Sequence, residues 1–397
     1  MAIVYSSAPS YFAANPKIMR FTGAVPGSRA TFVISVTPLH DDPATRFYNE
    51  TMYRYADANG VIEFDVSPAR QRGAAATYKT PLYATNAATW VRNLETYFEL
   101  AVEAYLVDAA DNVIRSVVSE GNYYLWGGTD MMRSINTFNT YFLGTFSAAS
   151  KALTRATTIE VNKYLPSFLL FKAEEWNGNK VTITAAKGAT SNALSPSTLD
   201  GQLNTQYLAT TYAEGDWILK RTDGSWWSLY KAQEYKMIVN NSLCVKEKVQ
   251  NEEFVYLRWL NSLGGYSFGV FEVTGRGIAV APRTRYRDYI YGFSTDVIAQ
   301  SDTETLSKDG QASLTIGRGQ VGWDQFEDLE DLLTSIEVLR WYPKREAGKP
   351  RLINSGTTAY DRWLPVQISG GSSGDRSKQY NDFACTLTMP QNFNQKR

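Results

Sequence analysis

The sequence predicts a mainly β protein whose N-terminal part is an antiparallel sandwich, and three observations support this fold class. Aromatic residues make up 13% of the 397 residues, among them 25 tyrosines, and aromatic side chains favour strands. Apolar and polar residues alternate with a period of two along many short runs, as they do in half-buried strands. Turns rich in Asp, Asn and Gly separate these runs, which is typical of antiparallel sheets.

The composition argues against several classes of function. The chain carries 40 Lys and Arg and 40 Asp and Glu, so its net charge is zero, whereas a general nucleic-acid binder needs a basic excess. One histidine (His40) and two cysteines are too few for an imidazole metal centre or a zinc finger. The 44% hydrophobic content is typical of a globular protein and not of a disordered one.

Residues 1–127 predict an immunoglobulin-like β-sandwich. Alternating runs such as RATFVISV (29–36) and VIEFDVS (61–67) are separated by turns, and Asn59-Gly60 supplies a hairpin turn that tolerates positive φ. Six such strands in about 110 residues fit one module of this kind. The Ala- and Thr-rich stretch 69–92 lacks a clear period, so we expect a long irregular excursion there.

The rest of the chain predicts a linker and two further β domains. Residues 128–160 are rich in Gly, Ser, Thr and Asn and are expected to form the linker. Residues 161–275 are expected to form a β-rich middle domain. Residues 276–397 are expected to form a C-terminal β domain with one short amphipathic helix near 323–335.

The segment near 323–335 has the clearest helical period in the chain. Its apolar residues fall on one face of a helix, and its acidic residues fall mostly elsewhere. The apolar stripe consists of Trp323, Phe326, Leu329, Leu332 and Leu333.

No set of residues predicts catalysis, cofactor binding or metal binding. A hydrolase triad needs a base such as His40, but this histidine lies in the turn-like segment TPLHDDPA. Adjacent acids such as Glu174 and Glu175 are poor catalytic pairs, because neighbouring strand residues point to opposite faces. We therefore expect a protein that is not an enzyme. A glycan-cleaving enzyme that uses two carboxylates stays open as the weakest alternative.

The cysteines and the N-terminus predict a chain that folds in a cytoplasm. Cys244 and Cys385 lie in alternating, strand-like segments, where we expect two buried free thiols, with a bridge between them as the alternative. The N-terminus lacks the basic start and apolar run of a secretory signal. Insertion into a membrane is not expected, because no segment has the ~20 apolar residues that span one.

Two segments are candidate interfaces. The segment PRTRYRDYIYGF (282–293) interleaves arginines with tyrosines, which are enriched at protein contacts and can also hold polyanions. Because the chain is neutral, a surface strand or a protein contact is the favoured interpretation. The pair Trp226-Trp227 places one indole on each face of a strand, so one is available for a subunit contact or as a platform for a sugar. The candidate interface residues are Arg283, Arg285, Tyr286, Arg287, Tyr289, Tyr291, Trp226 and Trp227.

The most distinctive segment is FVYLRWLNSLGGYSFGVFEVTG (254–275), which predicts a strand, a turn and a second strand. Asn261 and the pair Gly264-Gly265 allow the turn, and the flanking aromatic residues pack the hairpin. We expect an architectural role for Trp259 and for these three turn residues, with a positive φ at Gly264.

This segment resembles a Trp-x-Asn-x-x-Gly-Gly-aromatic segment of virion proteins from tailed phages and prophages of Bacteroidota hosts. The C-terminal helix and strands and the N-terminal sandwich are loosely similar to the same proteins. The matching residues of the segment are Trp259, Leu260, Asn261, Gly264, Gly265, Tyr266 and Phe268.

The resemblance implies a structural component of a phage tail, at the tail tip or baseplate. Such a protein binds other virion subunits and copies of itself in a ring or trimer. It is located in the virion after assembly in the cytoplasm of the bacterial host. The alternative is a receptor- or carbohydrate-binding tail protein that contacts a glycan on the host surface. Neither function requires a cofactor, a specific nucleic acid or a membrane.

Overall fold

A computed structural model of the chain is mainly β, which confirms the predicted fold class. The chain forms two compact units, Met1–Asn241 with Leu260–Ser267, and Ser242–Trp259 with Phe268–Arg397. The structure describes residues 4–7, 13, 16–38, 48–77, 90–92, 97–108, 110, 112–117, 122–126, 151–161, 165, 167–172, 180–198, 203–207, 213–221, 234–240, 253–291, 298–342, 362–371, 374, 377–389 and 393–396.

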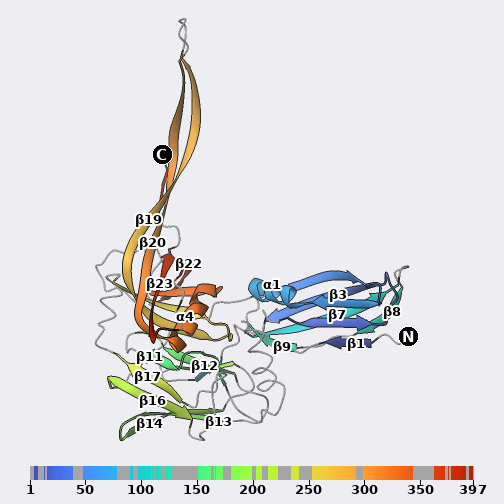
Figure 1. Cartoon of the computed structure of the whole chain (residues 1–397), viewed down its shortest axis with the longest axis horizontal. Coiled ribbons are helices and arrows are strands. Elements are labelled where there is room, and N and C mark those ends of the chain that lie inside the picture. Colours follow the sequence, from blue (N-terminus) through green and yellow to red (C-terminus); the bar gives the residue numbers. More distant parts are fainter. Residues whose placement is uncertain are drawn as a thin grey trace. The chain divides into compact units, whose positions relative to one another are not determined.

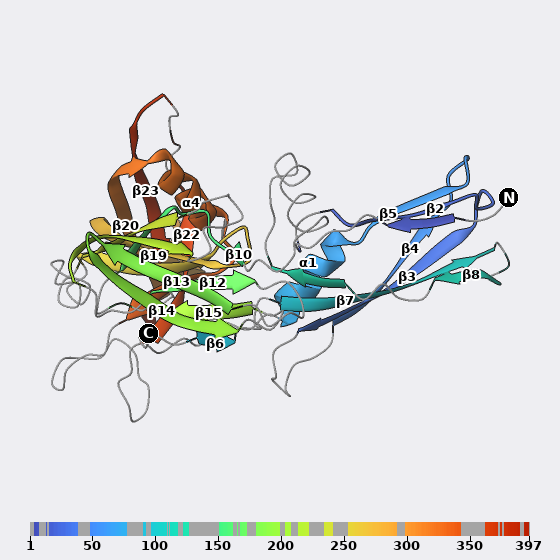
Figure 2. The same cartoon turned by 90° about the horizontal axis from the view of Figure 1, so that it is seen from below.

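The first unit begins with an antiparallel sandwich of two sheets, seen as two layers in Figure 2. One sheet has the order β4-β3-β7-β8, with β9 also paired to β7, and the other has the order β1-β2-β5. The strands of the first sheet are β3 (Arg29–Pro38), β4 (Tyr48–Tyr55), β7 (Tyr97–Val107), β8 (Val113–Val117) and β9 (Asn122–Leu125). Those of the second sheet are β1 (Val4–Ser7), β2 (Ile18–Thr22) and β5 (Val61–Asp65). The predicted N-terminal sandwich is thus confirmed.

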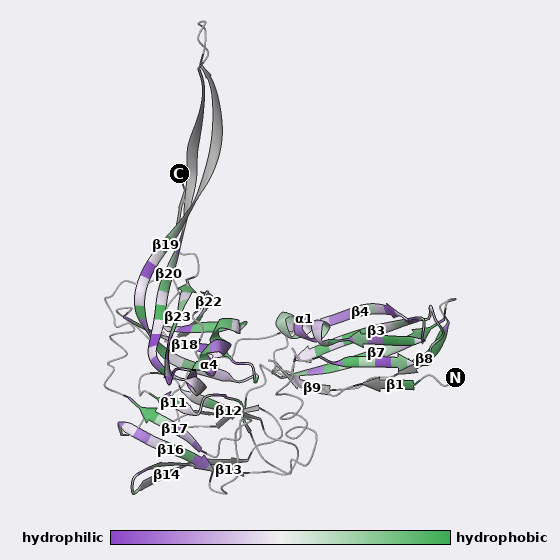
Figure 3. Cartoon of the chain, in the orientation of Figure 1, coloured by the Kyte–Doolittle hydropathy of each residue, from purple (hydrophilic) through white to green (hydrophobic). Residues whose placement is uncertain are grey.

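Alternation with a period of two builds the core of this sandwich. Every second residue of β3 is buried, and Phe32 lies between Ala30 and Ile34 on the inward face. Its ring stacks on Phe64 of the opposite sheet, with 4.5 Å between the ring centroids. Each large apolar side chain buried in this way contributes about 1.5–3 kcal/mol to folding. Figure 3 shows the apolar residues that recur along β3 and β7.

The stretch 69–92, expected to be irregular, contains most of helix α1 (Ser67–Thr77) and strand β6 (Trp90–Arg92). The carboxylate of Asp65 accepts hydrogen bonds from the backbone N–H and the hydroxyl of Ser67, both at 2.9 Å, where α1 begins. Gly73 allows α1 to approach β3, because a Cβ at this position would lie 2.5 Å from Val36 Cγ2. The residues that α1 buries are mostly small, so no apolar stripe reveals the helix in the sequence.

Two further sheets complete the first unit. One has the order β10-β12-β15-β6, and the other has the order β11-β17-β16-β13-β14, in which β11 runs parallel to β17. The first consists of β6 together with β10 (Lys151–Ala152), β12 (Phe168–Lys172) and β15 (Leu203–Tyr207). The second consists of β11 (Thr158–Val161), β13 (Lys180–Lys187), β14 (Thr190–Thr198), β16 (Gly215–Arg221) and β17 (Glu234–Val239).

The second unit is a closed β-barrel of six strands. Hydrogen-bonded neighbours follow the order β19-β18-β21-β22-β23-β20, and β19 pairs with β20 to close the ring. Its interior holds a chain of aromatic rings, in which Phe271 lies 6.2 Å from Trp259 and 6.0 Å from Phe383 between centroids. The barrel strands are β18 (Phe254–Leu260), β19 (Tyr266–Tyr291), β20 (Ile298–Gly322), β21 (Val338–Tyr342), β22 (Arg362–Ser369) and β23 (Tyr380–Thr388).

Helix α4 (Trp323–Thr334) connects β20 to β21 and confirms the helix predicted near 323–335. Phe326, Leu329 and Leu332 of its apolar stripe are buried and belong to the barrel core. Phe326 also meets Phe383 edge to face at 6.0 Å between centroids. The helical period in the sequence therefore identifies the face that packs on the barrel.

The boundaries of the two compact units differ from the boundaries expected for the domains. The boundary expected between residues 275 and 276 lies inside β19, which runs through it without a break. The end of the expected linker 128–160 contains β10 and most of β11. Strand β6 comes from the expected N-terminal domain but pairs with β15. Pairing between strands that are far apart in the sequence cannot be predicted from the local amino-acid composition.

Candidate functional site

The most prominent feature of the second unit is a two-stranded ribbon formed by residues 277–291 of β19 and 298–313 of β20, called the ribbon from here on. Figure 1 shows the two strands continuing together beyond the barrel. The backbone register is unbroken from Gly277 opposite Ser313 to Tyr291 opposite Ile298, apart from a bulge after Arg283. At about 3.4 Å per residue the ribbon is about 50 Å long.

The ribbon receives a third strand only near its middle. Strand β24 (Phe393–Lys396) pairs with residues 307–310 of β20, and β23 pairs with β20 only from Ser313 onward. Among the described residues, no strand pairs with the outer edge of β19 from Gly277 to Tyr291 or with that of β20 from Ile298 to Leu306. Unpaired edges of this length are templates for pairing with another chain.

The register of the ribbon places opposite charges at facing positions. Arg285 lies opposite Glu304, and Arg287 lies opposite Asp302. The basic segment found in the sequence is therefore matched by acidic positions on the other strand.

The predicted interface residues fall into two groups. The backbone positions from Arg283 to Tyr291 all lie on β19 within the ribbon, where the structure brings them together on one element. The second group, Trp226 and Trp227, lies outside the described residues, as do His40 and Cys244. The acidic positions of β20 were missed by sequence reasoning. The signal available was a second alternating run, IAQSDTET (298–305), that follows the first after a short break.

The structure places Asn261, Gly264 and Gly265 in a tight turn between β18 and β19. Gly264 has a φ of +77°, a region that glycine enters without strain. The backbone N–H of Asn261 donates to the Gly265 carbonyl at 2.8 Å, which closes the turn. A Cβ at Gly265 would overlap the carbonyl oxygen of Leu153, so a side chain is excluded there. Trp259, two residues before the turn, is buried in the barrel core.

The side chain of Asn261 is 1% exposed and makes four hydrogen bonds. Its Oδ1 accepts from the backbone N–H groups of Leu263 and Gly265, both at 3.0 Å. Its Nδ2 donates to the Leu153 carbonyl at 2.9 Å and to the Ser267 hydroxyl at 3.2 Å. A carboxamide has two donor hydrogens and two acceptor lone pairs, so this capacity is fully used. The side chain of Asn261 therefore fixes the turn, and it has no free donor or acceptor.

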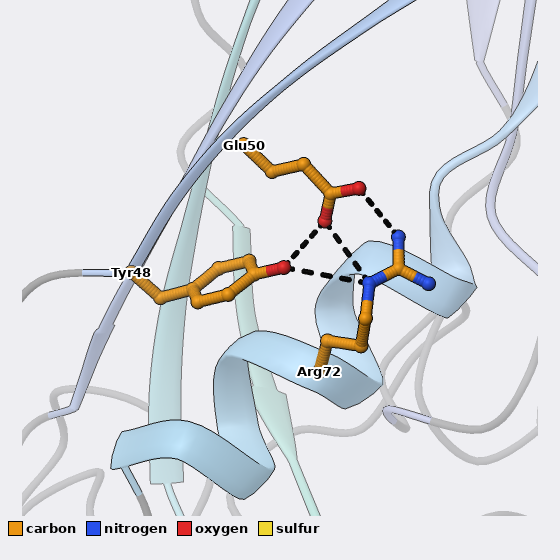
Figure 4. Close-up of polar contacts among 3 residues, drawn as sticks. All are labelled: Tyr48, Glu50 and Arg72. Carbon is orange, nitrogen blue, oxygen red and sulfur yellow. Dashed lines mark hydrogen bonds and ion pairs between the residues drawn. The ribbon is translucent and has the colours of Figure 1, made fainter.

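A cluster of three polar side chains joins α1 to β4 (Figure 4). Arg72 contacts both oxygens of Glu50, with Nη2 at 2.6 Å from Oε1 and Nε at 3.1 Å from Oε2. The hydroxyl of Tyr48 donates to Glu50 Oε2 at 2.5 Å. The hydrogen bond from Arg72 is the main cause that lowers the pKa of Glu50, while burial and then the bond to Glu50 raise the pKa of Tyr48. The three groups satisfy one another, which is the arrangement of a clamp between elements.

The described part of the chain offers little else for chemistry. No group of three or more His, Cys, Asp or Glu residues within it could hold a metal ion. Cys385 is a free and buried cysteine, as expected from its alternating segment, and burial raises the pKa of its thiol to about 12. Among the helices described, none is long and apolar enough to cross a membrane.

Comparisons with known proteins do not assign a family. No family model matches the sequence, and no curated protein matches it. Three solved structures are similar in parts. The fibronectin(III)-like modules of Clostridium thermocellum CbhA share 9% identity, with 61% of this chain and 95% of that chain covered and a TM-score of 0.15.

The second structure is the CsuC-CsuE chaperone–tip adhesion subunit complex of Acinetobacter baumannii pili. It shares 10% identity, covers 60% of this chain and 100% of that chain, and has a TM-score of 0.18. The third structure, from a 1.5-MDa bacterial ice-binding adhesin, shares 6% identity and has a TM-score of 0.16. The match covers 79% of this chain and 92% of that chain. Structural similarities as low as these do not indicate a function.

Proposed function

We propose that this chain is a structural subunit of a phage tail, at the tail tip or baseplate, and that it acts by binding copies of itself and other virion subunits. The observation that best supports assembly is the ribbon. It extends about 50 Å along two strands, and its outer end lacks a third strand among the described residues.

A two-stranded ribbon of this kind is not expected to be stable by itself. An isolated pair of strands is marginally stable in water, and a third strand or a covering surface is needed for stability. In an assembly, a neighbouring subunit supplies that surface and receives the open edges of β19 and β20.

The tail assignment is supported by the resemblance of the turn motif. An architectural part for this motif is supported by Asn261 and Gly265, which fix the β18–β19 turn. A turn fixed by buried hydrogen bonds suits a building block whose surfaces must keep a constant shape in an assembly. The proposed role is assembly, and it requires no catalytic group.

The test is a variant with a shortened ribbon. Residues 284–306 are removed, and Arg283 is joined to Ser307 by Asn-Gly, which forms a tight hairpin turn between these facing residues. The pairing of β24 with residues 307–310 is kept. We expect negative-stain images of the full chain to show rings or trimers and those of the variant to show separate subunits, with an unchanged circular dichroism spectrum. Rings that persist in the variant would contradict a role of the ribbon.

A further inference from the structure

The outer end of the ribbon is open along both of its edges over the same stretch. Residues 284–291 of β19 pair with residues 298–305 of β20, and among the described residues no further strand pairs with either segment. Strand β24 covers the edge of β20 only at residues 307–310, closer to the barrel. The two paired segments are called the open end from here on, and Figure 1 shows the ribbon that carries them.

The two edges of the open end are complementary in direction. Because β19 and β20 are antiparallel, one edge strand runs away from the barrel and the other runs back toward it. Rotation of a copy about an axis parallel to the ribbon keeps the direction of each strand and the distance of each residue from the barrel. The β19 edge of one copy can then meet the β20 edge of the next copy as an antiparallel pair, with open residues against open residues.

Other partners use only part of the open end. A two-fold dimer pairs β19 with β19 or β20 with β20, and it leaves the other edge of each copy exposed. A single strand from another protein likewise covers one of the two edges. Repeated pairing of β19 with β20 around a closed ring uses both edges of every copy through one kind of contact, so no edge of the open end stays exposed.

We propose that the open ends of neighbouring copies join edge to edge, with β19 of one copy against β20 of the next, and form one closed antiparallel barrel. The partner at each edge is thus a second copy of this chain. An antiparallel ladder has about one hydrogen bond per residue pair, so residues 284–291 supply about eight bonds at each junction. The inference rests on the proposed function, because it names the partner of the ribbon in that assembly.

The test is disulfide cross-linking between two co-expressed forms of the full chain, both with Cys244→Ser and with the buried Cys385 kept. One form carries Arg287→Cys on β19, and the other carries Asp302→Cys on β20. In the proposed ring, β19 and β20 of neighbouring copies lie about 4.8 Å apart, within reach of a disulfide. Equivalent strands of neighbouring copies lie about 9.6 Å apart, which is too far. We expect the mixture to cross-link at least about tenfold faster than either variant alone.

Two further variants allow for the tilt of strands in a closed barrel. Tilt shifts neighbouring strands along each other, and a shift by two residues keeps the pleat in phase. Gln300→Cys and Glu304→Cys therefore replace Asp302→Cys in parallel mixtures, and we expect one of the three to cross-link fastest with R287C. The matched control mixes R287C with Tyr380→Cys. Tyr380 is 56% exposed and pairs with the residue at the opposite end of β20 from the open end.

The outcomes separate this inference from the proposed function. Rings in negative-stain images, with no mixture faster than the Y380C control, would overturn the edge pairing and leave the proposed function standing. Cross-linking of R287C alone that is faster than in any mixture would overturn the inference in favour of a two-fold dimer through β19. Full chains that remain monomeric would contradict the inference and the proposed function together.

Discussion

The side chain of Asn261 is buried with all four of its hydrogen bonds made, so its amide cannot be removed without loss. Asn261→Ala leaves two turn N–H groups and the Leu153 carbonyl without this partner. We expect a loss of about 3 kcal/mol in the free energy of unfolding, measured by urea denaturation. The control is Asn59→Ala at the exposed turn between β4 and β5, which should change stability by less than about 0.5 kcal/mol. Equal losses of stability in the two variants would contradict this structural role of the Asn261 side chain.

The two glycines of the turn are required for different physical reasons. Gly264→Ala forces a side chain into positive φ, which costs about 1–2 kcal/mol. Gly265→Ala drives a Cβ into the backbone of Leu153, which cannot move aside as a side chain can. We therefore expect G265A to lower the melting temperature more than G264A. Gly269→Ala is the control, because its Cβ would lie at ordinary contact distance, 3.5 Å from Phe271. A lower melting temperature for G264A than for G265A would show that backbone strain at Gly264 costs more than the steric overlap at Gly265.

At the scale of elements, the clamp of Tyr48, Glu50 and Arg72 holds α1 against the edge strand β4. Arg72 lowers the pKa of Glu50, so the clamp stabilises the fold above the ordinary carboxylate pKa of about 4.5 and is lost as pH falls through the lowered value. Glu50→Gln should cost about 1 kcal/mol at pH 7, because the pair is partly exposed. The difference between wild type and E50Q should shrink below pH 4.5 in acid-denaturation series. A difference that is constant with pH would contradict the ionic clamp.

The elements also show which patterns in the sequence are informative. Alternation predicts β3 and the helical stripe predicts α4, because each element buries one face against a single core. Helix α1 escapes prediction, because it packs through Gly73 and small residues where no apolar period is needed. The turn at Asn261 is visible from Asn and Gly alone, but its bond to Leu153 joins residues 108 positions apart. Contacts of this separation depend on the tertiary fold and not on local sequence.

The ribbon illustrates the same limit for the candidate site. The arginines and tyrosines of residues 283–291 stand out in the sequence, and their alternation identifies a strand. The backbone positions of Glu304 and Asp302 lie opposite two of these arginines only through the hairpin register. Sequence reasoning therefore finds one half of the candidate interface, and the backbone pairing supplies the other half.

At the scale of the whole molecule, we propose that the chain functions as one subunit of an assembly. The open edges of β19 and β20 are the main reason to expect copies to associate. The most direct measurement is the mass of the full chain by native mass spectrometry, at micromolar concentration and low salt. We predict a closed oligomer, with a mass that is a multiple of the 44.5 kDa chain. A stable monomer under these conditions, with no ring, trimer or association with virions, would contradict the account.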